Sequence, residues 1–418
     1  MTAVLQATDV PLRLSVDADR LWADLLATAR FGAHGETGMH RLALGSADEE
    51  VRRWFEAECR ALGCTVEVDR IGNMFATLPG SEPGLAAIAV GSHLDTQPAG
   101  GRFDGILGIL AGVEILRVLK ASGRALRHPF TVVNWTNEEG SRFSPAMMGS
   151  GVFCGVHDIE TIYARVDKDG VTVREALGAI GYRGECAPGH LPMAAYLELH
   201  IEQGPVLEAD GSAVGIVTGV QGLRWLDIRM SGTEAHAGAF PMGLREDALV
   251  FAAKAVLAVE KVALKHPPGV ATVGYIHAVP NSRNVVPGDV RLEIDMRHPE
   301  ESGLAAMETD LTNEIERLAP GAQLSVVWRK APVVFDAALC EVIRQEAEGL
   351  CLSALEMVSG AGHDAAHVAA KAPTAMIFIP SREGLSHNER EYSSPQQCAN
   401  GADLLLRSVL RADELFHG

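Results

Sequence analysis

The first half of the chain alternates between two patterns of apolar residues. Apolar positions at helical spacing predict helices over residues 47–62 and 106–120. Short runs of apolar and β-branched residues predict buried strands over 85–91, 130–135 and 195–201. Buried strands that alternate with helices in this way are typical of an α/β domain with a largely parallel sheet.

The pattern changes near Gly219, where a unit with a different order of elements begins. Its spacing predicts strand, helix, strand, strand, helix and strand over 223–230, 245–263, 271–277, 290–296, 301–318 and 324–328. This order defines a split βαβ, or ferredoxin-like, unit. A length of about 110 residues is sufficient for a separate domain.

Beyond Phe335 the α/β pattern returns, with a helix predicted over 336–348, a strand over 374–379 and a helix over 396–411. We therefore expect an α/β fold in which a discontinuous catalytic domain, with a mixed and largely parallel sheet, receives the split βαβ unit as an insertion. The expected boundaries are 1–218 and 333–418 for the two parts of the catalytic domain and 219–332 for the inserted domain.

The composition argues against two classes of partner. The chain has 418 residues, of which 47% are hydrophobic and 22% charged, and its formal net charge is -18. A globular chain this acidic is not expected to bind nucleic acid or an anionic membrane surface, because both attract clusters of Lys and Arg. No window approaches the ~20 consecutive apolar residues of a membrane-spanning helix.

Two further features predict a cytoplasmic protein. Residues 1–20 lack a basic start followed by an apolar core, so we expect no secretory signal peptide. The seven cysteines are odd in number, scattered and without a CxxC pair, which is typical of free thiols in a reducing compartment.

The segment GSHLDTQPAGGRFDG, residues 91–105, lies between a predicted buried strand and a long helix. Ligand sites in open α/β sheets form at such junctions. His93 and Asp95 share one side of an extended backbone, which suits a metal-binding histidine and a neighbour that orients it. Asp104 lies where the helix begins. In the alternative interpretation, Asp104 only caps the helix and His93 is an ordinary turn histidine.

Carboxylates and histidines follow the other predicted strands. Glu138 and Glu139 come after 130–135, where one could bind a cation while its neighbour moves a proton. The alternative is a solvated acidic turn. His200 lies within an apolar strand, where a lone histidine is more often structural, and His387 lies in a polar loop, a common setting for functional residues.

Imidazole and carboxylate ligands together suit Zn²⁺, Mn²⁺, Co²⁺ or Ni²⁺. A shared aspartate can hold two such ions ~3.5–4 Å apart, as in two-metal hydrolases. His363 and His367 form a competing pair in HDAAH, but the glutamate of the zinc-protease motif is missing. The chain has no GxSxG elbow, no P-loop and no GxGxxG after a strand, which argues against serine hydrolases and nucleotide-binding enzymes.

Six motifs, in the same order along the chain, resemble one family. They are GSHLDTQPAGGRFDG, NWTNEEGSRF, ELHIEQGPVLE, SGTEAHAG, SGAGHDA and SREGLSHNEREY. Together they are similar to the N-carbamoyl-L-amino acid hydrolase, β-ureidopropionase and allantoate amidohydrolase group, within the aminoacylase- and carboxypeptidase-like dimetal superfamily. The resemblance implies a hydrolase that acts on linear amide C–N bonds.

The resemblance also implies two divalent metal ions per subunit, either Zn²⁺ or Mn²⁺, Co²⁺ or Ni²⁺. The side chains it assigns to them are His93 and His200 on one ion, Glu139 and His387 on the other, and Asp104 between them. It makes Glu138 the general base, Asp95 the residue that orients His93, and His236 the group that stabilises the oxyanion.

The positions that the resemblance assigns to the substrate are Gln203, His236, Asn284, Arg297 and Gly362. The fork of Arg297 suits a carboxylate. The expected reaction is hydrolysis of the ureido group of N-carbamoyl-L-amino acids or N-carbamoyl-β-alanine to amino acid, ammonia and carbon dioxide. The alternatives are an allantoate amidohydrolase, a metal-dependent dipeptidase or aminoacylase, and a catalytically silent binding protein. The expected partners are this small molecule and a second copy of the chain, with the inserted domain serving as dimerisation domain and lid.

Overall fold

The computed structural model describes residues 14–416, and it divides into two compact units. The first comprises the chain up to Thr218 together with Phe335–Met357 and the part from Gly362 onward, and the second comprises Gly219–Val334 and Val358–Ala361. Residues 1–13, which carry most of the segment tested for a signal peptide, lie outside the described part. Within the described part, no helix is both long and apolar enough to cross a membrane.

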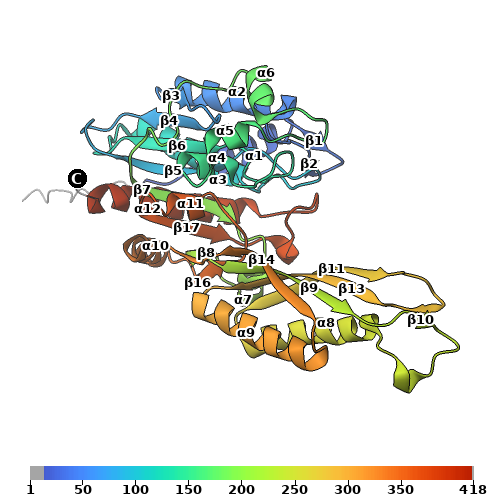
Figure 1. The fold of residues 1–418 in the computed structure, drawn as a ribbon. Helices are drawn as coiled ribbons and strands as arrows, with labels where there is room; N and C mark the ends of the chain where they lie inside the picture. Colours follow the sequence, from blue (N-terminus) through green and yellow to red (C-terminus); the bar gives the residue numbers. More distant parts are fainter. Residues whose placement is uncertain (1–13, 417–418) are drawn as a thin grey trace, which may run out of the picture. The chain divides into compact units, whose positions relative to one another are not determined.

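The first unit is built on a large mixed sheet (Figure 1). Its strand order is β8-β17-β7-β5-β6-β4-β3, and β16 pairs with β8. The strands are β3 (Thr65–Val68), β4 (Met74–Leu78), β5 (Ala87–His93), β6 (Phe130–Trp135), β7 (Met193–Ile201), β8 (Val214–Val220), β16 (Ala354–Ser359) and β17 (Thr374–Ile379). A short hairpin, β1 (Ala33–His34) with β2 (Gly38–Met39), lies apart from this sheet.

The middle of the sheet is parallel. Strands β17, β7, β5 and β6 are parallel neighbours, and the flanking strands β8 and β4 are antiparallel to them. All residues of β5, β6 and β17 are buried, because helices cover both faces of the sheet. The predicted α/β fold with a mixed, largely parallel sheet is therefore confirmed. The carboxyl ends of the four parallel strands meet at one edge of the sheet.

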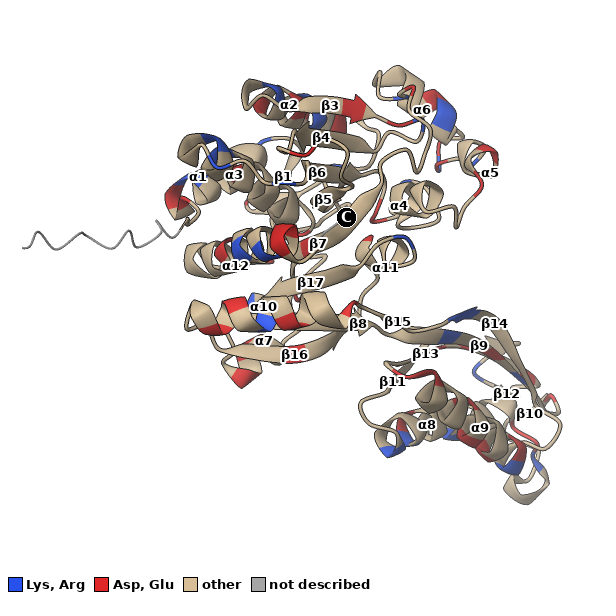
Figure 2. Cartoon of the chain, turned by 90° about the vertical axis from the view of Figure 1, so that its left-hand side faces the viewer, with Lys and Arg blue, Asp and Glu red and all other residues tan. Residues whose placement is uncertain are grey.

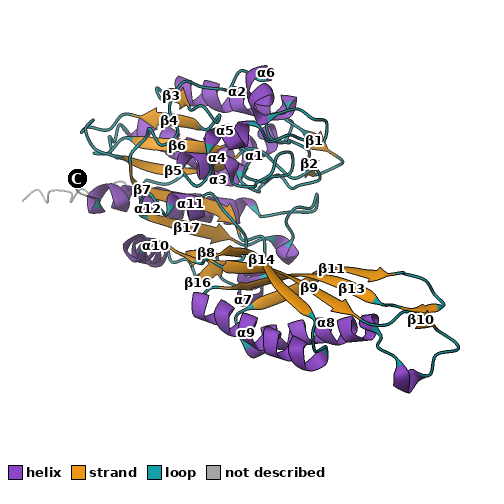
Figure 3. Cartoon of the chain, in the orientation of Figure 1, coloured by secondary structure: helices purple, strands orange, loops and turns teal. Residues whose placement is uncertain are grey.

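Helices lie on both sides of this sheet (Figure 3). Helices α3 and α12 pack on β5 and β7, whereas α4 contacts β6 and α11 contacts β7 and β17. The helices are α1 (Ala18–Thr28), α2 (Ser46–Ala61), α3 (Ile106–Ser122), α4 (Met148–Phe153), α5 (Ile159–Tyr163), α6 (Val173–Ala179), α7 (Val206–Asp210), α10 (Ala337–Gly349), α11 (Ala365–Val368) and α12 (Pro395–Leu415), with a 3₁₀ turn η2 at Arg382–Gly384. Helix α3 is apolar on nearly every side because it lies between the sheet and helices α1, α2 and α12.

The second unit is an antiparallel sheet with the order β11-β13-β9-β14. Its elements are β9 (Gly222–Ser231), β10 (Ala235–His236), η1 (Met242–Leu244), α8 (Ala248–Lys265), β11 (Val270–Val279), β12 (Val285–Val286), β13 (Asp289–His298), α9 (Glu301–Leu318), β14 (Gln323–Lys330) and β15 (Val333–Val334). Helices α8 and α9 share one core with the sheet. The order of strands and helices is that of a split βαβ unit.

Charges of both signs are mixed on the helices. Figure 2 shows blue and red segments together on α2, α9 and α10, and each of these helices carries both acidic and basic residues. Ion pairs on these surfaces contribute little to stability individually.

Helix α2 carries three ion pairs between residues four apart, and two of these pairs differ sharply in burial. Arg52 and Asp48 are 1% and 0% exposed in their side chains and pair at 2.8 Å, whereas Arg53 and Glu49 are 67% and 27% exposed. Arg52 also donates to the carbonyl oxygen of Gly72. We expect Arg52→Ala to lower the free energy of unfolding by about 3–5 kcal/mol, because it leaves the buried Asp48 carboxylate without its partner. Urea unfolding of Arg53→Ala is the matched control and should show little change; equal losses in both variants would contradict this account.

Candidate metal centre

The predicted ligands lie at the carboxyl ends of four neighbouring parallel strands. His93 is the last residue of β5, and His200 is the penultimate residue of β7. Glu139 follows β6 and His387 follows β17. Segments that are more than 100 residues apart in the sequence therefore meet at one edge of the sheet, where sites of α/β proteins form.

The first group of ligand atoms belongs to His93, Asp104 and His200, which are all buried. Oδ1 of Asp104 lies 3.4 Å from Nε2 of His93 and 3.1 Å from Nε2 of His200. These atoms surround a common point, and they could hold one cation.

The second group belongs to Asp104, Glu139 and His387. Nε2 of His387 lies 3.5 Å from Oδ2 of Asp104 and 3.3 Å from Oε2 of Glu139. Asp104 thus offers one carboxylate oxygen to each group. The sequence-based assignment placed the same residues in the same two groups.

The donor set fits divalent cations. Nδ1 of His93 lies 2.9 Å from the carbonyl oxygen of Asp95, and Nδ1 of His200 lies 2.9 Å from the carbonyl oxygen of Ile201. Each Nδ1 therefore carries the proton and donates it, which leaves the Nε2 lone pair facing Asp104. Metal-binding histidines are oriented in this way.

Asp95 supports the centre differently from the sequence-based expectation. Its backbone carbonyl, and not its carboxylate, makes the close contact with His93; the nearest carboxylate oxygen is 3.9 Å from Nδ1. The carboxylate instead accepts the backbone N–H groups of Glu138 and Glu139, each at 3.2 Å. Asp95 therefore positions the turn that carries both glutamates as well as the His93 ring.

Gly105 is required between Asp104 and helix α3. Its backbone has φ +68°, and a Cβ atom at this position would lie 2.4 Å from the His93 ring. Its N–H donates to Nε2 of His200. Any side chain here would displace a ligand, so the glycine in RFDG belongs to the centre.

Glu138 lies beside the first group, and its side chain contributes no atom to either group. Its Oε2 is 3.6 Å from Nε2 of His93, and the residue is 8% exposed. Burial raises the pKa of the Glu138 carboxyl well above its ordinary range; His93 opposes this shift, and the carboxylates of Asp364 and Glu139 add to it. Burial and Asp104 likewise raise the pKa of Glu139 to about 8. Carboxylates crowded in this way favour cations nearby.

Three side chains around the ligands were not found by sequence reasoning. Gln97 donates to both carboxylate oxygens of Glu139, through its backbone N–H and its side-chain amide. Oγ of Ser386 lies 3.0 Å from both Oδ2 of Asp104 and Oε2 of Glu391, and its single proton can be donated to either carboxylate. The buried Glu391 accepts the backbone N–H groups of Phe103 and Asp104. Their hydrogen-bond partners lie far away in the sequence, so the spacing of residues does not reveal these contacts. Only their position within the quoted motifs indicated proximity to the ligands.

Gln203 also lies in the centre. Its side-chain amide donates to Oδ2 of Asp104 at 2.8 Å, and its Oε1 is buried without a hydrogen-bond partner among the described residues. The backbone of Gln203 has φ +60°, and that of His387 has φ +53°. Left-handed conformations of non-glycine residues are strained and cluster at functional sites.

The predicted site residues of the second unit lie at two separate positions. Strand β10 pairs with β12, so His236 and Asn284 lie together; Ala237 donates its N–H to the Asn284 carbonyl oxygen. His236 is exposed, and its Nδ1 accepts the N–H groups of Gly238 and Ala239, which leaves the proton on Nε2.

Arg297 lies in the four-stranded sheet, at the end of strand β13 that is far from the β10–β12 pair. It pairs with Leu223 and Val270, whereas the β10–β12 pair lies beyond the Asp289 end of strand β13. The guanidinium binds Asp295 and the carbonyl oxygen of Gly360. In the first unit, Gly362 is exposed.

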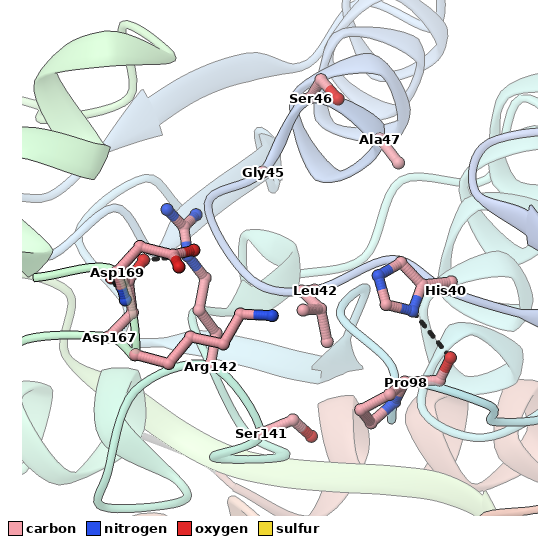
Figure 4. Close-up of a pocket in the computed structure, with 11 residues that line it drawn as sticks. His40, Leu42, Gly45, Ser46, Ala47, Pro98, Ser141, Arg142, Asp167 and Asp169 are labelled. Carbon is pink, nitrogen blue, oxygen red and sulfur yellow. Dashed lines mark hydrogen bonds and ion pairs between the residues drawn. The ribbon is translucent and has the colours of Figure 1, made fainter. Parts of the chain in front are cut away.

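A cavity of about 490 Å³ in the first unit is lined by none of the predicted site residues. The residues in contact with it are His40, Leu42, Gly45, Ser46, Ala47, Pro98, Ser141, Arg142, Asp167, Lys168 and Asp169 (Figure 4). Nδ1 of His40 bonds to the carbonyl oxygen of Pro98, and Arg142 pairs with Asp167. Pro98 directly follows Gln97, which binds Glu139, so one residue of the cavity wall is adjacent in sequence to a residue that supports the centre.

Known proteins resemble this chain over nearly its whole length. Residues 89–411 match the model of peptidase family M20/M25/M40. An N-carbamoyl-L-amino-acid amidohydrolase of Rhizobium meliloti is 45% identical over 405 residues, which cover 96% of this chain and 97% of that protein. A ureidoglycolate hydrolase of Arabidopsis thaliana is 34% identical over 408 residues, 94% of this chain and 86% of that one. The crystal structure of an amidase of the hydantoinase/carbamoylase family from Burkholderia multivorans has a TM-score of 0.92 at 45% identity and covers 96% of this chain and 98% of that one.

Proposed function

The chain belongs to peptidase family M20/M25/M40 and is a carbamoylase-type amidohydrolase, and we propose that its substrates are small N-carbamoyl amino acids. Water and the ureido group give the amino acid, ammonia and carbon dioxide. The observation that carries the proposal is the pair of ligand groups that share Asp104, with the Glu138 carboxyl beside them. This arrangement suits hydrolysis of a planar carbonyl carbon.

We assign two divalent cations to these groups. His93 and His200 would hold one, Glu139 and His387 would hold the other, and Asp104 would offer one carboxylate oxygen to each. When bound, such ions supply Lewis acidity that polarises a carbonyl oxygen and lets water ionise near neutral pH. The ligand set of nitrogen and oxygen atoms is compatible with Zn²⁺, Mn²⁺, Co²⁺ or Ni²⁺.

The chain's own residues move the protons. Glu138 accepts a proton from the attacking water at a carboxylate oxygen and returns it to the leaving nitrogen. His236 donates from Nε2 to the oxyanion that forms on the former carbonyl oxygen, a role that the proton on Nε2 supports.

Gln203 favours a ureido group over a simple amide. Its Nε2 donates to Asp104 in the centre, and its Oε1 is buried there as an acceptor without a partner among the described residues. The terminal NH₂ of a carbamoyl group supplies the donor for that acceptor, whereas the methyl group of an acetyl substrate leaves it buried and unpaired. We assign the substrate's carboxylate to Arg297 and the backbone at Gly362, and its neighbouring atoms to Asn284.

These assignments require two copies of the chain. Strand β13 separates Arg297 from the end of the sheet that carries His236 by roughly 26 Å, since extended residues rise ~3.3 Å each. A small N-carbamoyl amino acid cannot reach both. We therefore propose a homodimer in which His236 and Asn284 of the second unit complete the centre of the other copy. Exposed apolar residues on edge strand β11 and on α8, such as Tyr275, Ile276 and Leu257, support an interface there.

Mixing two inactive variants tests this exchange. Glu138→Gln and His236→Ala homodimers should each be inactive. After dissociation and reassociation, each heterodimer contains one complete centre, so ammonia release should recover to about one quarter of the wild-type value. If His236 acts within its own chain, neither centre of the heterodimer is complete and no activity returns.

A second candidate substrate comes from the relatives named ureidoglycolate hydrolase. Ureidoglycolate carries the same ureido group and carboxylate, with a hydroxyl group on the carbon between them. Relative kcat/KM for N-carbamoyl-L-amino acids, their D-enantiomers, N-carbamoyl-β-alanine, allantoate and ureidoglycolate decides among these. We expect an N-carbamoyl amino acid to have the highest kcat/KM. If ureidoglycolate or allantoate had the highest value, that compound would be the preferred substrate instead. The native metal, the homodimer and the cytoplasmic location stay predictions.

A further inference from the structure

Three side chains with metal-binding atoms meet in the first unit outside the centre described above. Glu67 lies on strand β3, and Cys186 and His190 lie in the segment between α6 and β7. One ligand atom from each lies within 4.8 Å of the other two. Sγ of Cys186 is 3.9 Å from Oε1 of Glu67, and Nε2 of His190 is 3.8 Å from Oε2 of Glu67.

The His190 ring is held in the tautomer that a metal ligand needs. Its Nδ1 lies 3.1 Å from the carbonyl oxygen of Ala187 and donates a proton to it. Its Nε2 is buried and has no hydrogen-bond partner among the described residues. The ring packs at a right angle to the Phe75 ring, with centroids 4.8 Å apart, and this packing restricts its rotation. A fixed, buried lone pair without a donor is costly unless something binds it.

The backbone that presents Cys186 is tied to the edge of the sheet. Gly184 and Cys186 donate their N–H groups to Asp69 and Val68, and Arg70 donates to the carbonyl oxygen of Cys186. The chain then reverses at Gly189, where φ is +79°. These contacts hold the thiol and the imidazole beside Glu67 without the help of a ligand.

We propose that Glu67, Cys186 and His190 form a third metal site, which is distinct from the two-metal centre and suited to Zn²⁺. Thiolate, imidazole and carboxylate are all Zn²⁺ ligands, and bond lengths of 2.0–2.3 Å place tetrahedral ligand atoms roughly 3.3–3.6 Å apart. The Glu67 side chain is half-exposed, so it can rotate toward an ion held by Cys186 and His190. Water fills the fourth position, and the thiol proton leaves to solvent as the ion binds.

The site has a structural role. It clamps the segment that precedes β7 onto strand β3, the edge strand of the sheet on this side. A covered edge cannot pair with another chain. The alternative is a thiol that only donates a hydrogen bond to Glu67, with no metal ion.

Cobalt spectroscopy separates these alternatives, because the two-metal centre has no sulfur ligand. We expect metal-free protein loaded with excess Co²⁺ to show a sulfur-to-cobalt charge-transfer band in the near ultraviolet. Cys186→Ser should abolish the band and lower the bound Zn²⁺ by one equivalent per chain, with ammonia release within twofold of the wild type. The exposed Cys351, changed to serine, is the matched control and should leave the band intact.

Two outcomes would overturn the proposal. One is the absence of the band from wild-type protein under excess Co²⁺, and the other is its persistence in Cys186→Ser. His190→Gln provides a second check, since it should weaken Zn²⁺ binding at this site while ammonia release stays unchanged. None of these readouts depends on which substrate the two-metal centre accepts, so this proposal and the proposed function fail independently.

Discussion

Changing Glu138 to glutamine should stop catalysis and leave the metal ions in place. Glu138 is 3.6 Å from His93 but contributes no atom to either ligand group. Its carboxyl is proposed to take the proton from water and hand it to the leaving nitrogen. A glutamine has nearly the same shape but cannot accept that proton. We expect ammonia release to fall about 10²- to 10⁴-fold, the usual contribution of a general base.

The neighbouring glutamate provides the matched control. Glu139 is bound by Gln97 and faces His387, so Glu139→Gln should lower the metal content as well as the activity. Metal analysis of both variants distinguishes the roles of the two adjacent carboxylates. If Glu138→Gln lost metal while Glu139→Gln kept its full complement, the two assignments would be reversed.

Changing Asp104 to alanine should empty both metal positions together. Its two oxygens face different ligand groups, so its loss removes one ligand and half of a shared negative charge from each. Loss of a residue that merely supports a ligand typically costs about 10- to 100-fold in metal affinity, and loss of a shared ligand should cost more. In a Cys186→Ser background, which lacks the proposed third site, we expect less than one equivalent of metal per chain and no detectable turnover.

His387→Ala is the comparison for this variant. It leaves the group of His93, Asp104 and His200 complete, so one metal ion should remain. Both variants would be made in a Cys186→Ser background, which removes the proposed third site. Equilibrium dialysis then counts only the metal ions bound at the two-metal centre. Two equivalents bound to Asp104→Ala would contradict a bridging role.

Long, periodic elements of the fold could be predicted from the sequence. The helix predicted over 106–120 is α3, and the strand predicted over 130–135 is β6. Strands β3 and β8 were missed, because β3 is only four residues long and β8 contains two glycines. Such strands are stabilised by their neighbours in the sheet and not by their own residues.

The ligands were assigned from the resemblance of the motifs to one family, and the structure brings these side chains together because the motifs contain or follow the carboxyl ends of neighbouring strands. Their supporting contacts could not be predicted. Ser386, for example, connects Asp104 with Glu391, and that connection depends on the loop after β17 lying over the loop after β5. The role of Asp95 was predicted only in part, because a spacing of two residues does not reveal whether the carboxylate or the carbonyl faces the histidine.

The relative positions of the residues predicted to bind the substrate could not be inferred from the sequence. His236, Asn284 and Arg297 are close in the sequence, yet the antiparallel register of β13 places Arg297 at the far end of the sheet. Only the folded second unit reveals that one small molecule cannot contact all three. The proposed exchange between two copies follows from this separation.

The ratio of ammonia to free amino acid shows whether the protein hydrolyses a ureido group or a simple amide. Wild-type protein loaded with metal would be given an N-carbamoyl-L-amino acid and, separately, the N-acetyl derivative of the same amino acid. We predict one ammonia for each amino acid released from the carbamoyl compound. Turnover of the acetyl compound should be slower by a factor of at least about 100, because its methyl group leaves Oε1 of Gln203 unpaired. Rapid release of amino acid from the acetyl compound, with no ammonia from the carbamoyl compound, would contradict it.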